Sequence, residues 1–325
     1  MGKHSERVTC KARISINTCA TPASVTPDFI SAASGEWEGH KVYFDADGTA
    51  EPIPEKFMPP AFKEWGQVLV DWQSQCAMNV TTDGGLYARE LRFIPTAGCE
   101  ADSSTVETQW DRNVDLTNIT PAVVCDGCSI ALGSYSTGPT DLSEGSSAQE
   151  CNTVTIEHCL HFDDAPSKKN PEGKRSRVRV QQKIKGEENI FALEKITVWK
   201  EFYYEPFNNA VSLCSSCGGP NKWGEYPVLP VDVFLEGVWG GDAWAGFGGA
   251  LGDVVLLPTG IYSKVTTSSS GELTSEAGWF IPDRDASYLP PSRDVESHLV
   301  SQRTYGEDGK LADASFAKRE RQAAK

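Results

Sequence analysis

The sequence lacks the short motifs that mark common catalytic and nucleotide-binding sites. It contains no Gly-x-Ser-x-Gly elbow, no His-Glu-x-x-His motif and no phosphate-binding loop. It has only five histidines, and the close pair His158 and His161 would face opposite sides of a strand. The residues alone therefore identify no reaction class.

An excess of positive charge and an uninterrupted apolar run are also missing. The net charge is −15 and the pI is about 4.8, so we expect the surface to repel nucleic acid backbones. A membrane-spanning helix needs about 20 nearly uninterrupted apolar residues. The most apolar region, residues 228–257, is interrupted by acidic side chains at Asp232, Glu236, Asp242 and Asp253. We therefore predict no nucleic acid partner and no membrane span.

The beginning of the sequence has few acidic residues and no continuous apolar core. Residues 1–26 contain Glu6 as their only acid, together with several basic and many hydroxyl side chains. This composition is typical of an organelle transit segment and not of a secretory signal, although an unstructured tail is equally compatible. We expect residues 1–30 to be a flexible leader or the remnant of a transit peptide.

Cysteine is too sparse for a disulfide scaffold, with 10 in 325 residues. Two Cys-x-x-Cys pairs stand out, Cys125 with Cys128 and Cys214 with Cys217. Four thiolates can hold a structural zinc ion, but these pairs lie much farther apart than in common zinc modules. A disulfide or redox pair and unliganded thiols remain alternatives, so the four cysteines are weak metal candidates.

What the sequence does contain is a long series of alternating segments. Residues 35–44 place Trp37 and Tyr43 on one face of a strand and Val42 and Phe44 on the other. The glycines beside Trp37 leave room for its indole to lie across a barrel floor. About eight such strands precede residue 206, and about eight strands can close a barrel around one small ligand.

Residues 177–204 form the clearest predicted hairpin. Its first strand places Arg177 and Arg179 on one face, and the returning strand places Trp199 and Glu201 together on one face. The arginine row could pair with a ligand carboxylate, or it could be a solvated outer face. Glu201 is a candidate for a polar group inside a cavity.

Proline, glycine and charge divide the chain into segments. We predict a barrel over residues 31–205, a linker over 206–230 and a second, smaller unit over 231–311. The last segment, residues 312–325, is charged and rich in alanine, which predicts an exposed helix or tail. About ninety residues follow the linker, which is few for a second complete barrel.

Several stretches resemble a known family. Gly35-Glu36-Trp37 resembles the Gly-x-Trp opening of lipocalin-like (calycin) proteins. The chain is similar to the cyanobacterial and plastid family catalogued as domain of unknown function 3598, through residues 35–47, 62–76, 177–181, 196–201 and 278–305. The resemblance implies tandem lipocalin-like barrels, distantly similar to the lyases that attach bilins to phycobiliproteins, and it supports a plastid location. It defines no catalytic residues.

The expected fold is therefore all-β: an antiparallel lipocalin-like barrel followed by a second, smaller lipocalin-like barrel or a docked sheet. Large aromatic and charged side chains inside a barrel either fill it or line a ligand pocket. The candidate ligand-binding residues are those expected to face the interiors: Trp37, Tyr43, Trp72, Arg177, Arg179, Trp199, Glu201 and Trp239.

Three functions follow from these expectations. The first is a chloroplast protein that binds a hydrophobic or tetrapyrrole-type ligand, with a carotenoid or lipid as alternatives, and acts as a carrier or assembly chaperone. The second is a chromophore lyase or isomerase on the same barrel, with Glu201 as the acting group. The third is a structural or assembly factor of a plastid protein complex, whose barrels are filled by side chains.

Overall fold

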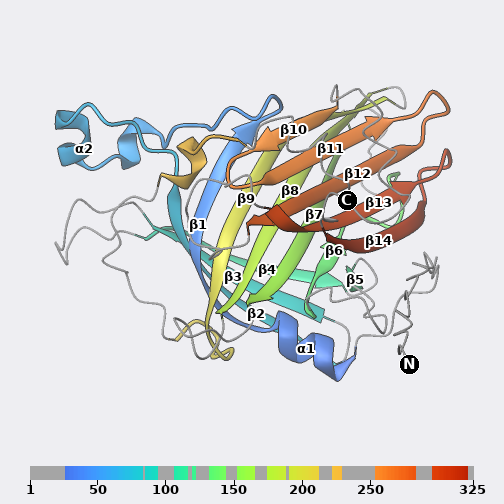
Figure 1. Ribbon diagram of the computed structural model, residues 1–325, viewed down its shortest axis with the longest axis horizontal. Coiled ribbons are helices and arrows are strands. Elements are labelled where there is room, and N and C mark those ends of the chain that lie inside the picture. Colours follow the sequence, from blue (N-terminus) through green and yellow to red (C-terminus); the bar gives the residue numbers. More distant parts are fainter. Residues whose placement is uncertain are drawn as a thin grey trace, which may run out of the picture.

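The computed structural model shows a nearly all-β protein with two antiparallel sheets and a few short helices (Figure 1). It describes residues 26–82, 85–93, 106–115, 119–121, 132–143, 152–164, 174–187, 190–211, 222–228, 253–282 and 295–320. In this part of the chain, no helix is long and apolar enough to cross a membrane.

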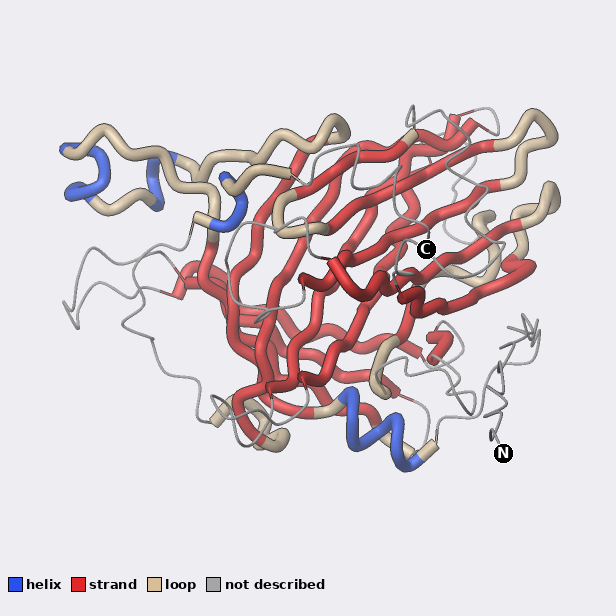
Figure 2. Tube along the Cα trace, viewed as in Figure 1, coloured by secondary structure: helices blue, strands red, loops and turns tan. Residues whose placement is uncertain are grey.

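The first sheet has nine strands in the order β4-β3-β2-β1-β9-β8-β7-β6-β5. Their bounds are β1 (Gly35–Asp45), β2 (Trp72–Val80), β3 (Gly85–Phe93), β4 (Val106–Asp115), β5 (Ile119–Pro121), β6 (Tyr135–Thr137), β7 (Asn152–Asp164), β8 (Lys174–Glu187) and β9 (Ile190–Glu205). The two edge strands follow each other directly in the chain, so Asp115 and Ile119 lie within about 14 Å of each other. The sheet is therefore curled into an incomplete barrel (Figure 2).

The second sheet is a meander of five strands, β10-β11-β12-β13-β14, in sequence order. They are β10 (Val254–Leu257), β11 (Ile261–Thr267), β12 (Leu273–Pro282), β13 (Val295–Tyr305) and β14 (Leu311–Glu320). This sheet lies across one face of the first sheet (Figure 1). Of the two alternatives predicted for this part, a docked sheet is correct and a second barrel is wrong.

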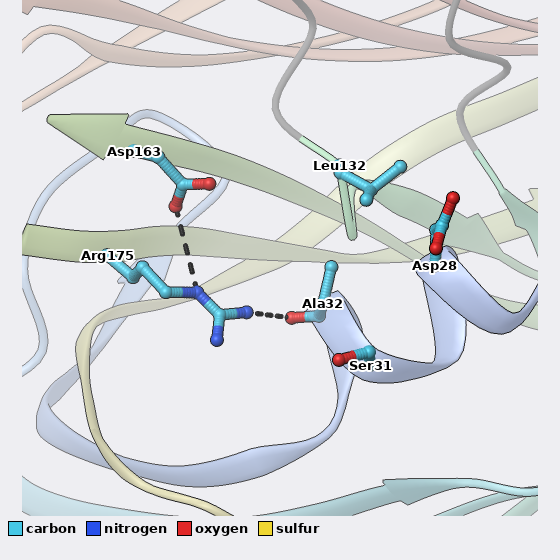
Figure 3. Close-up of a pocket in the computed structure, with 6 residues that line it drawn as sticks. All are labelled: Asp28, Ser31, Ala32, Leu132, Asp163 and Arg175. Carbon is cyan, nitrogen blue, oxygen red and sulfur yellow. Dashed lines mark hydrogen bonds and ion pairs between the residues drawn. The ribbon is translucent and has the colours of Figure 1, made fainter. Parts of the chain in front are cut away.

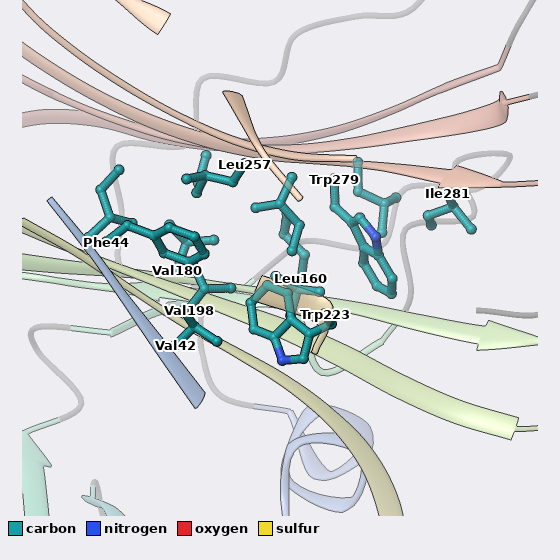
Figure 4. Close-up of a cluster of buried hydrophobic side chains, with 14 of the residues drawn as sticks. Val42, Phe44, Leu160, Val180, Val198, Trp223, Leu257, Trp279 and Ile281 are labelled. Atoms are coloured by element: carbon teal, nitrogen blue, oxygen red, sulfur yellow. The ribbon is translucent and has the colours of Figure 1, made fainter. Parts of the chain in front are cut away.

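The main apolar core lies between the two sheets. Val42, Val180 and Val198 of the first sheet meet Leu257 and Trp279 of the second (Figure 4). Burial of such side chains stabilises the fold by about 1.5–3 kcal/mol each. The face predicted for Val42 and Phe44 from the alternation of β1 is confirmed by this cluster.

A polar contact adds specificity to the interface between the sheets. His158 of β7 places Nδ1 2.8 Å from Ser301 Oγ and Nε2 2.8 Å from Ser275 Oγ. Gln182 of β8 donates from Nε2 to Ser263 Oγ at 2.8 Å. All five side chains are buried, so these bonds satisfy groups that water cannot reach. They fix the register of one sheet against the other.

Helix α1 (Pro27–Ala33) lies below the first sheet, next to the beginning of β1. Thr26 caps its first turn by accepting a hydrogen bond from the Phe29 amide at 3.2 Å. Phe29 and Ala33 are buried in a cluster with Trp37 and Met78, so α1 covers one end of the curled sheet. The predicted leader over residues 1–30 is therefore too long, because α1 begins at Pro27.

The remaining helices are short. The 3-10 helix η1 (Glu55–Phe57) and helix α2 (Pro60–Glu64) lie in the excursion between β1 and β2, and η3 (Trp223–Glu225) lies in the predicted linker. Trp223 of η3 is fully buried in the cluster between the sheets (Figure 4). The linker thus supplies a core residue.

The charged end of the chain is not a helix or tail as far as residue 320. Leu311–Glu320 form β14, which pairs with β13 along its length, for example Phe316 with Ser301. Alanine, lysine, arginine and glutamate favour helix only weakly, and pairing with an existing strand outweighs that preference.

Candidate functional site

The inner face of the curled sheet gathers the candidate residues. Strand alternation turns Trp37, Tyr43, Trp72, Arg177, Arg179, Trp199 and Glu201 to this face, and cross-strand register sets Arg177 beside Glu201 and Arg179 beside Trp199. Seven of the eight predicted residues thus share one interior. The eighth, Trp239, lies outside the described residues.

Glu201 holds the two arginines at the centre of this interior. Its Oε2 accepts from Arg177 Nε at 2.7 Å and from Arg179 Nε at 2.9 Å, and its Oε1 accepts from Arg179 Nη2 at 2.8 Å. Burial alone would raise the pKa of Glu201, but the two guanidinium groups outweigh it and lower the pKa to about 2. Glu201 is therefore a fixed anion.

Further ion pairs extend from Arg179. Its Nη2 lies 3.3 Å from Glu90 Oε2 and its Nη1 lies 3.7 Å from Glu157 Oε2. Glu90 also accepts from Lys41 Nζ at 2.8 Å. Burial lowers the pKa of Lys41 to about 8, although Glu90 opposes this shift. Three buried cations and three buried carboxylates therefore face one another around Arg179.

Cations and aromatic rings alternate along the same interior. The Trp199 ring lies between Arg179 Cζ at 4.3 Å and Lys41 Nζ at 4.4 Å, and Arg92 Cζ lies 4.4 Å from the Trp72 ring. At the α1 end, Arg177 Cζ lies 4.0 Å from the Trp37 ring, and Arg175 Cζ lies 4.4 Å from the Tyr203 ring. Each such contact contributes about 0.5–2 kcal/mol when desolvated. In the middle of the interior the predicted ligand-binding side chains contact one another.

The arginine row is not a solvated outer face. Arg177 and Arg179 are 0% and 1% exposed. A charged alternation usually marks a solvent face, but a curled sheet that carries a second sheet has both faces covered. The carboxylate partner of these two arginines is Glu201 from the neighbouring strand.

The α1 end contains a residue that the sequence did not single out as a ligand-binding candidate. His161 lies edge-on to Trp37, with ring centroids 5.1 Å apart, and it is the cross-strand neighbour of Arg177. Burial and the charges of Arg177 and Arg175 hold its pKa well below the usual value, so the imidazole is neutral. As predicted, His158 and His161 face opposite sides of β7. The spacing of Glu157, Cys159 and His161 by two residues was the sequence signal that could have placed His161 on the interior face.

Glycines shape this end. An added Cβ on Gly39 would lie 2.0 Å from the Lys200 carbonyl oxygen, and one on Gly35 would lie 2.6 Å from the Tyr203 ring. Both positions flank Trp37 and let β1 approach β9 closely. Trp37 is buried, and it stacks edge-on against Tyr203 with centroids 5.5 Å apart. This arrangement fits the predicted role of Trp37 as a barrel floor.

Four buried nitrogens at the α1 end have no hydrogen-bond partner among the described residues. They are Trp37 Nε1, Arg177 Nη2 and both ring nitrogens of His161. Buried polar groups are nearly always paired, because an unpaired donor costs about 1–3 kcal/mol. Their gathering in one place indicates a site for a polar group that the described residues do not supply.

A pocket of about 230 Å³ lies at the same end of the curled sheet, beside α1 (Figure 3). Its wall is formed by Asp28, Ser31 and Ala32 of α1 with Leu132, Asp163 and Arg175. Arg175 Nε lies 3.8 Å from Asp163 Oδ1, and its Nη2 donates to the Ala32 carbonyl oxygen. Burial raises the pKa of Asp163, against the charge of Arg175. Arg175 therefore connects the pocket with the ring and cation contacts of the interior.

The predicted metal candidates are not placed by the structure. Cys125, Cys128, Cys214 and Cys217 lie outside the described residues. Within the described part of the chain, no group of three or more His, Cys, Asp or Glu side chains could hold a metal ion. Cys76 and Cys159 are buried free thiols, and burial raises the pKa of Cys159 to about 12. These two thiols are therefore unreactive packing residues.

Comparison with known proteins finds a structural neighbour. The chain is similar to a protein of unknown function from the DUF3598 family of Nostoc punctiforme, at 16% identity over 91% of this chain and 98% of that chain, with a TM-score of 0.45. It also matches outer membrane phospholipase A from Escherichia coli at 10% identity over 88% and 90% of the chains, with a TM-score of 0.16. No family model and no curated protein matches the sequence. A DUF3598-family protein is thus a structural neighbour, as the resemblance predicts, and neither likeness bears on function.

Proposed function

We propose that the protein is a lipocalin-like binding protein of plastids that carries a hydrophobic or tetrapyrrole-type ligand, or presents it during assembly. The observation that carries this proposal is the pocket at the α1 end, where Arg175 lies between the pocket and the Tyr203 ring. Arg175, with the Tyr203 ring behind it, suits a flat, apolar molecule that bears a carboxylate. The distant similarity to bilin lyases is an expectation that agrees with such a ligand.

The size of the pocket limits how the ligand enters. Sites for drug-sized ligands are usually about 300–1,000 Å³. A pocket of about 230 Å³ takes one arm or edge of a tetrapyrrole and leaves the rest at the surface. The interior beyond it is occupied by Trp37, Arg177 and Glu201, so the ligand binds at the end of the curled sheet.

Binding is favoured over catalysis by the state of Glu201. A lyase or isomerase needs a group that exchanges protons near neutral pH. Two arginines lower the pKa of Glu201 to about 2, so the predicted acting residue stays ionised. Its oxygens are already engaged by Arg177 and Arg179, which leaves it the role of a counter-ion.

Titration with biliverdin tests the proposal. We expect biliverdin to quench tryptophan fluorescence of the full chain at micromolar concentration. Arg175→Ala should weaken binding about ten-fold or more, since a hydrogen bond to a charged group contributes about 1.5–3 kcal/mol. Lys183→Ala is the matched control, because Lys183 lies on the same strand and pairs with Glu194 at the surface. Quenching that is absent, or equal in both variants, would contradict the proposal.

An assembly factor without a ligand is the second candidate. The packing of cations and rings in the middle of the interior favours it, because a filled barrel needs no ligand for stability. This alternative predicts that biliverdin leaves the melting temperature unchanged. A ligand that binds only the folded state would instead raise it.

A further inference from the structure

We propose that Trp37, His161 and Arg177 form a buried carboxylate-binding site behind the pocket. This inference rests on the proposed function. The site receives the acidic group of the ligand, which Arg175 attracts first. The ligand class is thereby narrowed to carboxylic acids. A small free carboxylate offers the same chemistry, and the experiment below separates the two sources.

The first argument is the contrast between the two central arginines. Arg179 pairs with three carboxylates, those of Glu201, Glu90 and Glu157. Arg177 has one carboxylate contact, from Nε to Glu201, and its Nη1 faces the Met78 sulfur at 3.3 Å. Its Nη2 has no partner among the described residues. Of these two arginines, Arg177 is therefore the one whose charge is less compensated.

The second argument is that neighbouring donors surround this nitrogen. Arg177 Cζ lies 4.0 Å from the Trp37 ring, and His161 lies 5.1 Å from the same ring. Trp37 Nε1 and both nitrogens of His161 also lack partners in the described part of the chain. A neutral imidazole carries one N–H, so the site offers one guanidinium NH2, one indole N–H and one imidazole N–H.

The third argument is the position of the site relative to the pocket. Along β7 and β8, the pair Asp163 and Arg175 is followed inward by the pair His161 and Arg177. Two residues of a strand advance about 6.8 Å, so the two pairs are successive neighbours on one face of the sheet. His161 also lies against the pocket wall, because an added Cβ on Gly133 would be 2.9 Å from His161 Nδ1 and 3.0 Å from Ala32.

The donor set fits a carboxylate better than a phosphate. Arg177 shares Glu201 with Arg179, and its Nη2 has no acceptor among the described residues. A carboxylate brings one negative charge to this group, whereas a dianion would leave an unpaired buried charge of its own. Two carboxylate oxygens can accept from all three donors. Buried water could satisfy the same nitrogens, and it is the outcome that the experiment has to exclude.

The experiment compares biliverdin with its dimethyl ester on the full chain, followed by the absorption of the pigment. The free acid should bind at least about ten-fold more tightly than the ester. Trp37→Phe should remove this preference, because phenylalanine keeps a ring for Arg177 and loses the indole N–H. Trp199→Phe is the matched control, since Trp199 stacks on Arg179, which is already compensated.

A second variant keeps the test decisive if Trp37→Phe does not fold. His161→Phe retains a ring against Trp37 and deletes two unpartnered nitrogens, so we expect it to fold normally. It should also lose the preference for the acid. Equal affinity of acid and ester in the unaltered chain, or equal losses in Trp37→Phe and Trp199→Phe, would overturn the carboxylate site while leaving the binding function intact.

Calorimetry with propionate alone distinguishes the two proposals. If neither biliverdin nor its ester binds, the proposed function fails. Propionate binding that disappears in His161→Phe would then still establish a site for a small free carboxylate. No heat from propionate, together with no preference for the acid, would mean that water fills the site and would overturn the inference.

Discussion

At the scale of single residues, Glu201 determines how the interior is organised. It is the residue that touches both Arg177 and Arg179, and it is completely buried. Without it, the two cations would be neighbours on the same strand, β8, in a medium that screens charge poorly. Removing one partner of a buried ion pair is costly for this reason, even where the intact pair adds little net stability.

Glu201→Gln tests this reading by a change of charge at nearly constant shape. We expect it to lower the free energy of unfolding by about 3–5 kcal/mol, measured by urea denaturation. The matched control is Glu51→Gln, which breaks the half-exposed pair with Lys195 and should cost less than about 1 kcal/mol. Similar losses in the two variants would show that the interior charges are solvated.

The same residues show what the sequence could reveal about the site. Period-two alternation placed Arg177, Trp199 and Glu201 on the correct faces of β8 and β9, and it grouped seven of the eight candidate residues. It could not show that this face lies inside the curled sheet, so a solvated arginine row remained an alternative. The partners of Arg179 come from β3, β7 and β9, and such long-range pairing leaves no local signal.

At the scale of elements, η3 joins the two sheets. Its Trp223 is inserted between them, packed near Phe44 with ring centroids 6.1 Å apart. The backbone amide of Gly224 donates to Asp71 Oδ1 at 3.0 Å, which anchors η3 next to the start of β2. The segment predicted as a linker is therefore part of the core.

Trp223→Ala should be among the most destabilising substitutions in the chain. Truncating a buried tryptophan typically costs about 3–5 kcal/mol, because a cavity remains. Trp65 supplies the control, since it is 60% exposed and its removal should change stability by less than about 0.5 kcal/mol. Thermal unfolding of both variants measures the difference. A midpoint temperature of Trp223→Ala close to that of Trp65→Ala would contradict the role of η3 in the core between the sheets.

Most of the elements were predictable, and the exceptions share a physical cause. The sequence predicts strands between turn residues at 86–94, 153–162, 261–266 and 273–281, and the structure has β3, β7, β11 and β12 there. β14 was missed because its composition favours a helix. α1 was missed because a seven-residue helix has too few turns for a periodic signal. In both places, packing against the sheets decides the structure.

At the scale of the whole molecule, the first sheet is covered on both faces. Its outer face packs on the second sheet through Val180 and Trp279, and its inner face holds the ion pairs of Glu201. The predicted boundary at residue 205 therefore separates two stretches of sequence that share one core. The polar interior and the apolar interface have to form together, which couples the charge state of buried groups to the stability of the entire fold.

This coupling predicts a maximum of stability near pH 6.5. Burial lowers the pKa of His158 from 6.5 to about 3, that of His40 to about 4 and that of His161 well below 6.5. Below pH 6.5 the unfolded chain binds protons that the folded chain does not, so their contribution is lost as the pH falls. Burial raises the pKa of Asp71 from 3.8 to about 8, so the folded chain keeps that proton and loses stability as the pH rises toward 8.

Three histidines outweigh one aspartate on the acid side by two protons, so stability should rise by about 2.7 kcal/mol per pH unit up to pH 6.5 and then decline. Urea unfolding from about pH 4 to about pH 8.5 measures this curve. Asp71→Asn should abolish the decline above pH 6.5 and make the acid side steeper, because the amide oxygen can still accept from Gly224. His158→Asn should lower the slope of the unfolding free energy against pH, below pH 6.5, by the equivalent of about one proton. An unaltered chain whose stability falls steadily between pH 4 and pH 6.5 would show that these histidines are protonated in the folded state.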